Sequence, residues 1–206
     1  MVLADVVNLA LADKAIAAGA HGIVCVSAGA GGHTGTLSPF AFAAEVRSRF
    51  GGIVVLAGGI ATGAGVAAAI AAGADLVYVG TRFIAATESL APPAYKAMVV
   101  DAGLEDLCVS AAITGTPASW LVPSLRAHGL EPQALASAGA GMRNYASAAE
   151  AARRWRDLWS AGQGVGLVRA VEPVAAIVAD LEAGMRKAAG RLGSWVDKNY
   201  IVHLCK

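Results

Sequence analysis

The sequence predicts an α/β fold built around a parallel β-sheet. Short apolar runs rich in β-branched residues, at 22–26, 53–57 and 76–79, alternate with alanine-rich stretches of helical length. The segments 17–26 and 71–79 also repeat one pattern, in which a helix end is followed by a Gly-Ala turn and a buried strand. Strands that alternate with helices in this way form βαβ units, and their strands run parallel. The pattern is compatible with a (β/α) barrel and with an open sheet.

The composition predicts one large core. Of the 206 residues, 56% are hydrophobic and 15% are charged, which excludes disorder for most of the chain. A net charge of +1 and 6% aromatic residues do not provide the basic surface that nucleic acids require. Residues 15–44 and 50–74 contain no Asp, Glu, Lys or Arg, but glycines interrupt both stretches. We therefore expect buried β-turn-α units there, and no membrane span.

The cysteines and the N-terminus predict a cytoplasmic protein. Cys25, Cys108 and Cys205 are far apart and odd in number, so they indicate neither a disulfide framework nor a metal site. Asp5 and Asp13 fall within the first apolar stretch, and no basic segment precedes it, so it does not resemble a signal peptide.

The first part of the chain is predicted to contain four strands and three helices. In order, these are a strand at 2–7, a helix that ends at Gly19, a strand at 22–26, a helix at 39–49, a strand at 53–57, a helix at 63–72 and a strand at 76–79. Gly19 stands where a C-terminal cap belongs. Ser38 and Pro39 suit the N-cap and the first helical position, and Thr62 can cap the third helix.

The second part of the chain is less regular. We expect a fifth strand, and with it a fifth βα unit, within 107–113, followed by an irregular excursion over 115–146 that is rich in proline and glycine. Ser147 and Glu150 form a capping box for a helix that reaches Trp159, and Pro173 opens a last amphipathic helix. These elements divide the chain into βα units at 1–114, an excursion with C-terminal helices of the same domain at 115–190, and a tail of unknown role at 191–206.

The loop Gly29–Gly35 is the first candidate site, because it places His33 among glycines directly after a strand. Glycines let backbone N–H groups approach a ligand closely. Histidine exchanges a proton near neutral pH. The loop therefore predicts a cradle for an anionic or planar ligand beside a proton-transfer group. A flexible turn with an incidental surface histidine is the alternative, and spacing alone leaves both open.

Glycine and polar residues also follow the other predicted strands. Gly58-Gly59 and Gly80-Thr81 each lie between a strand and a helix, where backbone N–H groups bind phosphate. Tight turns are the alternative explanation. A rival pattern, Gly63-Ala64-Gly65, fits the dinucleotide fingerprint, but five residues separate it from its strand and no acidic residue completes it.

Four motifs together resemble one family. They are Ala30-Gly-Gly-His-Thr-Gly35, Ala57-Gly-Gly-Ile60, Val79-Gly-Thr-Arg-Phe83 and Ala161-Gly-Gln163. In this order and spacing they resemble the nitronate monooxygenases, formerly called 2-nitropropane dioxygenases, over residues 2–188. Flavin-dependent enoyl-acyl-carrier-protein reductases share the motifs.

The resemblance implies a TIM-type (β/α)8 barrel that binds FMN. It implies that His33 is the catalytic histidine and that Gly31 and Gly32 lie at the flavin. The remaining implied contacts are the phosphate cradle, formed by Gly58, Gly59, Val79, Gly80 and Thr81, and a residue near the cofactor, Gln163.

The sequence departs from the family pattern in two ways. Val26 and Gly29 stand where family members commonly have Gln and Glu, which indicates a different pocket. A (β/α)8 barrel has eight strands and about 250 residues, whereas we count five units here. We therefore expect an incomplete barrel that resembles the C-terminal part of a longer protein, with the N-terminal units missing or supplied by another chain, and a possible homo-oligomer.

The function that the resemblance implies is oxidation of alkyl nitronates by molecular oxygen with FMN as cofactor and His33 as acid or base. The expected partners are a small nitronate and O2, not a nucleic acid or a membrane. One alternative is an NAD(P)H-dependent enoyl-thioester reductase on the same scaffold. The other is an inactive, flavin-binding fragment.

Overall fold

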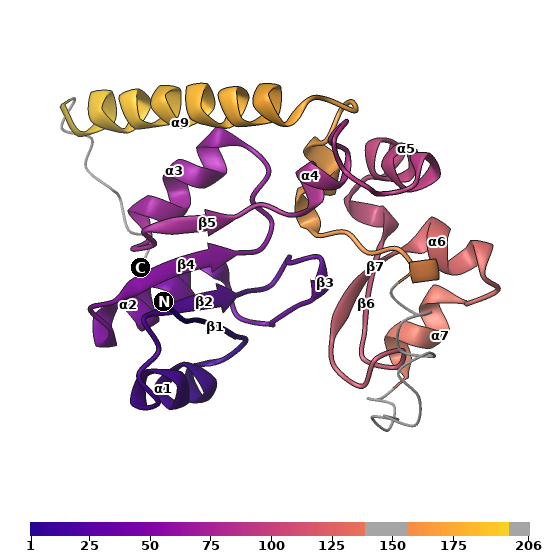
Figure 1. Ribbon diagram of the computed structural model, residues 1–206, viewed down its shortest axis with the longest axis horizontal. Helices are drawn as coiled ribbons and strands as arrows, with labels where there is room; N and C mark the ends of the chain where they lie inside the picture. Colours follow the sequence, from indigo (N-terminus) through magenta and orange to yellow (C-terminus); the bar gives the residue numbers. More distant parts are fainter. Residues whose placement is uncertain (139–155, 198–206) are drawn as a thin grey trace, which may run out of the picture.

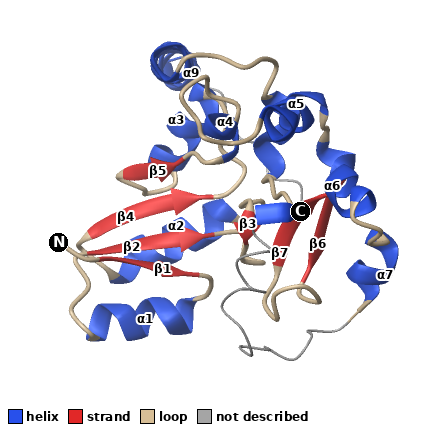
Figure 2. Ribbon diagram, turned by 45° about the vertical axis from the view of Figure 1, so that its right-hand side comes forward, coloured by secondary structure: helices blue, strands red, loops and turns tan. Residues whose placement is uncertain are grey.

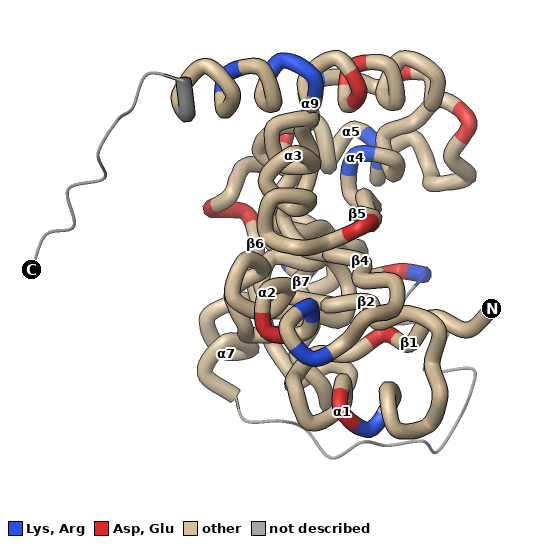
Figure 3. Tube along the Cα trace, turned by 90° about the vertical axis from the view of Figure 1, so that its left-hand side faces the viewer, with Lys and Arg blue, Asp and Glu red and all other residues tan. Residues whose placement is uncertain are grey.

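The computed structural model describes residues 1–138 and 156–197. Figure 1 shows a parallel sheet with its helices at one end of the molecule and a smaller antiparallel sheet at the other. One long helix, α9 (Val174–Asp197), runs along the top of the parallel part. In Figure 3, the acidic positions of α9 lie toward the start of the helix and its basic positions toward its C-terminal end.

The larger sheet confirms the predicted α/β fold. It contains β1 (Leu3–Val6), β2 (Gly22–Val26), β4 (Ile53–Ala57) and β5 (Leu76–Tyr78), in the order β1-β2-β4-β5. All three pairings are parallel. Because parallel strands point the same way, the loops that follow all of them emerge at one edge, as Figure 2 shows.

Three helices cover one face of this sheet. They are α1 (Leu9–Ala17), α2 (Pro39–Arg49) and α3 (Gly63–Ala71). Ile23, Phe42 and Leu56 are almost fully buried in the core between sheet and helices, and each buried side chain of this size contributes about 1.5–3 kcal/mol. The side chains of Asn8 and Thr62 cap α1 and α3 by accepting bonds from backbone N–H groups.

The other face of the sheet carries a thinner apolar layer. Val24, Val55 and Ala57 are buried there, and three half-buried side chains pack against them. On the edge strand β5, Leu76 and Tyr78 remain 52% and 47% exposed. Four parallel strands form this open sheet, whereas a closed barrel of this type has eight.

The prediction of five βα units is wrong, because the fifth predicted strand does not join the parallel sheet. The described part of the chain has four such units. The fifth strand is present as β6 (Leu107–Ser110), but it pairs antiparallel with β7 (Ala118–Leu121) in a separate sheet. The connection 111–117 is too short for the crossover of a dozen or more residues that a parallel pair needs. The chain reverses there with Gly115 at a φ of +75°. The short strand β3 (Gly32–His33) pairs with the other side of β7.

The expected irregular excursion is largely regular where the structure describes it. After β7 come α6 (Val122–Ala127) and α7 (Pro132–Ser137). Proline occupies the first turn of both helices, where its missing N–H has no intrahelical partner to lose. The prolines therefore begin helices in this segment instead of excluding them. The helix expected after Gly80-Thr81 is α4 (Thr81–Ile84), which begins at Thr81 itself. No expected element corresponds to α5 (Pro93–Asp101) or to the 3-10 turns η1 (Leu104–Asp106) and η2 (Gln163–Leu167).

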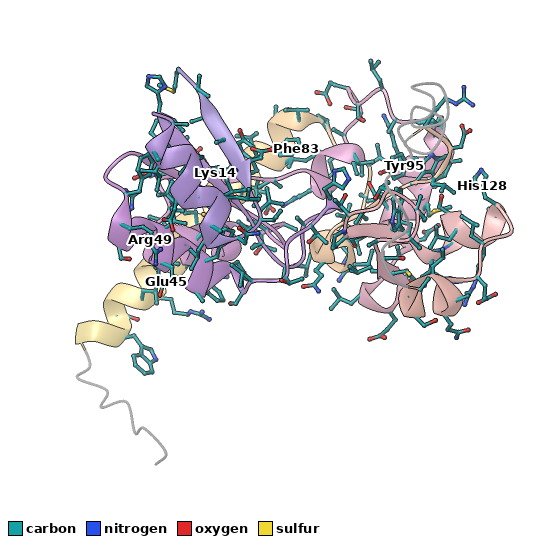
Figure 4. All side chains as sticks on the ribbon, turned by 90° about the horizontal axis from the view of Figure 1, so that it is seen from below. Lys14, Glu45, Arg49, Phe83, Tyr95 and His128 are labelled. Atoms are coloured by element: carbon teal, nitrogen blue, oxygen red, sulfur yellow. The ribbon has the colours of Figure 1, made fainter. Side chains whose placement is uncertain are left out.

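The proposed capping box of Ser147 and Glu150 lies outside the described residues. The helix expected to reach Trp159 ends before it, because the Trp159 carbonyl accepts the N–H of Leu121 at 2.9 Å beside β7. The indole stacks on Tyr95 with ring centroids 4.9 Å apart. Figure 4 places Tyr95 in the antiparallel part, far from the Arg49 and Glu45 pair on helix α2 of the parallel part.

The tail expected from residue 191 is helical as far as Asp197, because α9 continues past Gly190 without a break. A glycine inside a helix costs about 1 kcal/mol relative to alanine and does not by itself end it. Helix α9 packs along α3. Among the described residues, none of the helices is long and apolar enough to cross a membrane.

Candidate active site

A hollow of about 240 Å³ lies at the carboxyl edge of the parallel sheet. It is lined by Asp5, Val26, Gly29, Ala30, Gly31, His33, Ala57, Gly58, Gly59, Ile60, Tyr78, Gly80, Thr81 and Gly164. Six of the nine predicted site residues are in this lining: Gly31, His33, Gly58, Gly59, Gly80 and Thr81. The loops that follow the parallel strands therefore meet at this hollow, as their position after the strands predicts.

The carbonyl of Gly29, the residue directly before the first motif, connects it with the second and fourth motifs. The Gly29 carbonyl accepts the N–H of Gly59 at 3.0 Å and the N–H of Gln163 at 2.9 Å. Gly29 and Gly59 both have positive φ, at +90° and +68°, which L side chains rarely adopt. Gly58, with a φ of +131°, also lacks space, because a Cβ there would lie 2.9 Å from the carbonyl oxygen of Ala28.

The glycine of the fourth motif allows a close approach of two backbones. A Cβ on Gly162 would lie 2.5 Å from the Gly29 carbonyl oxygen, and a Cβ on Gly31 would lie 2.6 Å from the Gly162 nitrogen. The Gly162 N–H donates to Oγ1 of Thr81 at 2.9 Å. Thr81 therefore fixes the 161–163 segment as well as lining the hollow.

His33 stands where the two sheets meet. It belongs to β3 and pairs with Ala118 of β7. The next residue, Thr34, donates its N–H to the Pro117 carbonyl at 3.0 Å and its hydroxyl to the Ser27 carbonyl at 3.1 Å. The antiparallel sheet thus holds the histidine in place, while its exposed side chain faces the hollow of the parallel sheet.

Three predicted site residues lie outside the lining. Gly32 pairs with Ser119 in β3, and Val79 follows β5 as a half-buried residue. Gln163 lies behind the glycine loop, where its Oε1 would be 2.9 Å from a Cβ on Gly29. Its carboxamide therefore lies beside Gly29. Val26 and Gly29 are the two positions at which the sequence departs from the family pattern, and both line the hollow.

The N-terminus of α4 faces the hollow, whereas that of α3 does not. Gly80 and Thr81 begin α4 and are in the lining, and the first N–H groups of a helix have no intrahelical partner. The start of α3 is already capped by Thr62, and Gly63 packs against α9, where a Cβ would overlap the Leu181 carbonyl. Close helix packing therefore explains Gly63, and the dinucleotide fingerprint does not.

Asp5 and Tyr78 are lining residues that the sequence analysis did not single out as site residues. They belong to β1 and β5, the two edge strands of the sheet. Asp5 interrupts an otherwise apolar run, which is the one signal that could have identified it.

Neither described cysteine is suited to nucleophilic chemistry. Burial raises the pKa of the Cys25 thiol to about 11, and it also raises the pKa of Cys108. The reactive thiolate is therefore scarce at neutral pH. In residues 1–138 and 156–197, His, Cys, Asp and Glu form no group of three or more that could hold a metal ion.

Comparison with known proteins supports the resemblance carried by the motifs. The family model described as nitronate monooxygenase matches residues 2–184. A nitronate monooxygenase of Paraburkholderia phytofirmans is 32% identical over 210 residues, which cover 92% of this chain and 56% of that protein. This chain thus spans little more than half the length of that curated relative.

Two solved structures extend the comparison to the fold. FabK from Thermotoga maritima aligns with a TM-score of 0.78 and 30% identity over 94% of this chain and 63% of its own. A nitroalkane oxidase from Streptomyces ansochromogenes aligns with a TM-score of 0.72 and 32% identity over 92% of this chain and 58% of its own. With its motifs joined at one hollow and a family match over most of its length, the chain belongs to the nitronate monooxygenase family.

Proposed function

We propose that the chain binds FMN in the hollow at the sheet edge and takes part in the oxidation of alkyl nitronates by molecular oxygen. The observation that carries the proposal is that His33 lines the same hollow as the 58–59 and 80–81 loops. A proton-transfer group and two loops of the phosphate-binding type therefore face one ligand.

The shape of the loops fits the phosphate of FMN. Gly58, Gly59 and Gly80 present backbone without side chains, and the start of α4 adds N–H groups that suit an anion. The family resemblance implies FMN as the ligand of this cradle. The Gln163 carboxamide beside Gly29 supplies a polar group near a position where the family pattern has one.

The residues of the chain would act on the substrate, while a bound flavin supplies the redox chemistry. His33 is exposed to the hollow and is held by β7. It would therefore present one imidazole nitrogen to the nitro group of the nitronate and hold or transfer a proton there. The pairing of β3 with β7 holds the backbone of His33 beside the glycine loops.

The test replaces His33 with Asn. We expect the variant to retain FMN, because the phosphate loops are unchanged, and to lose nitronate-dependent oxygen consumption. Unchanged turnover would eliminate the acid-base role. An absorbance spectrum of the purified chain comes first, since a chain without flavin absorbance after incubation with FMN would support the alternative of a non-catalytic fragment.

An enoyl-thioester reductase on the same scaffold is the second candidate. It is favoured by the alignment with FabK, which covers 94% of this chain at 30% identity. Anaerobic addition of NADPH or NADH separates the two functions. Rapid bleaching of the flavin would support the reductase, whereas an unchanged spectrum that bleaches only on addition of nitronate would support the oxidase.

A further inference from the structure

Arg82 places a buried guanidinium between three separate segments of the chain. Its side chain is only 9% exposed. Nη1 donates to the Ala61 carbonyl at 3.1 Å and to Oδ2 of Asp180 at 2.8 Å, and Nη2 lies 3.5 Å from Oε2 of Glu172. One side chain therefore connects the loop after β4, the helix α4 and the C-terminal segment that includes α9.

Both ends of this connection lie close to the hollow. Ala61 comes two residues after Gly59, and Arg82 comes directly after Thr81. Ala61 is also confined from the other side, because a Cβ on Gly164 would lie 2.8 Å from the Ala61 Cβ. A change in the position of the guanidinium would move the 58–61 loop relative to the start of α4.

The guanidinium is committed to these partners. Its described bonds go to a backbone carbonyl and two carboxylates, and Arg82 is absent from the lining of the hollow. It is thus unsuited to contact a ligand phosphate directly. The planar fork of arginine can hold a carbonyl and a carboxylate at the same time, which the single ammonium of lysine reproduces poorly.

We propose that Arg82 is a positioning residue that sets the spacing of the two phosphate-binding loops by tying both of them to α9. Recognition of the FMN phosphate then depends on a contact outside the hollow. This inference rests on the proposed function, since it names the element that shapes the phosphate side of the same site.

The two ion pairs contribute little to holding this geometry. Asp180 is 64% exposed and Glu172 is 36% exposed, so solvent screens both charges. The bond to the Ala61 carbonyl is buried, and it is the one that reaches the 58–61 loop. The proposal therefore predicts a local effect on the loops that exceeds any general loss of stability.

The test compares the affinities of the full chain for FMN and for riboflavin, which lacks the phosphate. R82M should lower FMN affinity at least tenfold and change riboflavin affinity less than twofold. The FMN affinity of R82K should fall between those of R82M and the unchanged chain. D180N should lower FMN affinity by a smaller factor than R82M. The matched control is R186M, which removes an exposed arginine paired with Glu182 on α9. An equal loss of both ligands in R82M, or FMN affinity within twofold of the unchanged chain, would overturn the proposal.

Hydrogen exchange without ligand gives a second readout that does not depend on the proposed function. In R82M the backbone amides of residues 59–62 and 81–84 should exchange at least tenfold faster, while those of β2 and β4 keep their protection. R186M should leave all of them unchanged. If the unchanged chain binds neither flavin, the proposed function fails and exchange alone decides the role of Arg82. The proposed role would be refuted if exchange in R82M became faster throughout the chain, or if it did not change at all.

Discussion

Replacing Gly162 with Ala tests whether the close approach of two backbones builds the site. The added Cβ would lie 2.5 Å from the Gly29 carbonyl oxygen, 2.7 Å from the Gly31 nitrogen and 3.1 Å from the Ala30 carbonyl carbon. All three neighbours are backbone atoms, so no flexible side chain can move aside. The φ of Gly162 is −93°, which alanine adopts freely, so steric overlap is the sole expected cost.

The size of the effect follows from this overlap. Overpacking in a well-packed interior costs about 1–3 kcal/mol, and contacts with backbone on every side place Gly162→Ala in the upper half of that range. For a chain of this length, a loss of about 2–3 kcal/mol corresponds to a decrease of roughly 1 M or more in the urea midpoint, given a slope of about 2 kcal/mol per M.

The assay is urea unfolding followed by circular dichroism, with Gly51→Ala as the matched control. Gly51 has no atom within 4 Å of an added Cβ and no positive φ. Its replacement should be neutral or should stabilise the chain by up to about 1 kcal/mol, because alanine restricts the unfolded state. If Gly162→Ala unfolds within about 0.5 kcal/mol of the unchanged chain, the explanation of the 161–163 motif as backbone packing is wrong.

Two further substitutions test contacts outside the hollow. The hydrogen bond from the Val54 N–H and, next, the Arg47 guanidinium lower the pKa of Asp75 in the folded chain. The carboxylate therefore contributes its full stabilisation above about pH 4, the pKa of the unfolded chain. This stabilisation is lost as the pH falls through the lower pKa of the folded chain. Asp75→Asn should flatten the loss of stability below about pH 4 in acid titrations, and an unchanged acid profile would contradict this. Tyr95→Phe removes a hydroxyl that donates to the Ser160 carbonyl at 2.5 Å and accepts the Ser160 N–H at 3.2 Å, and it should cost about 1–2 kcal/mol in urea unfolding; a change below about 0.3 kcal/mol would show that solvent replaces both bonds.

The sequence predicts the parallel sheet and its carboxyl edge because local patterns determine both. A short β-branched strand, a glycine turn and an alanine-rich helix indicate each βα unit in the sequence. Once the strands are parallel, topology alone requires that the loops with His33, Gly58 and Gly80 share one edge. These residues do line one hollow.

The errors occur where distant contacts decide the structure. The apolar run at 107–110 is compatible with a parallel or an antiparallel strand, and the short connection to Ala118 selects the second. No local signal shows that Gly162 packs against Gly31, or that β7 holds His33. The family resemblance placed Gln163 near the site, but the structure is needed to show that its backbone shares the Gly29 carbonyl with Gly59.

The same geometry explains how the two sides of the candidate site differ. The side formed by the glycine loops is braced from several directions, by Gly29 bonding to two segments, by Thr81 bonding to Gly162 and by Arg82 behind both loops. Toward the sheet edges, Asp5 and Tyr78 line the hollow from strands that pair on one side only among the described residues. Under the proposed function, the FMN phosphate would contact this braced backbone, and Asp5 and Tyr78 would lie beside the ligand on the edge strands β1 and β5. Affinity that depends on the phosphate is therefore the sharpest measure of what this arrangement recognises.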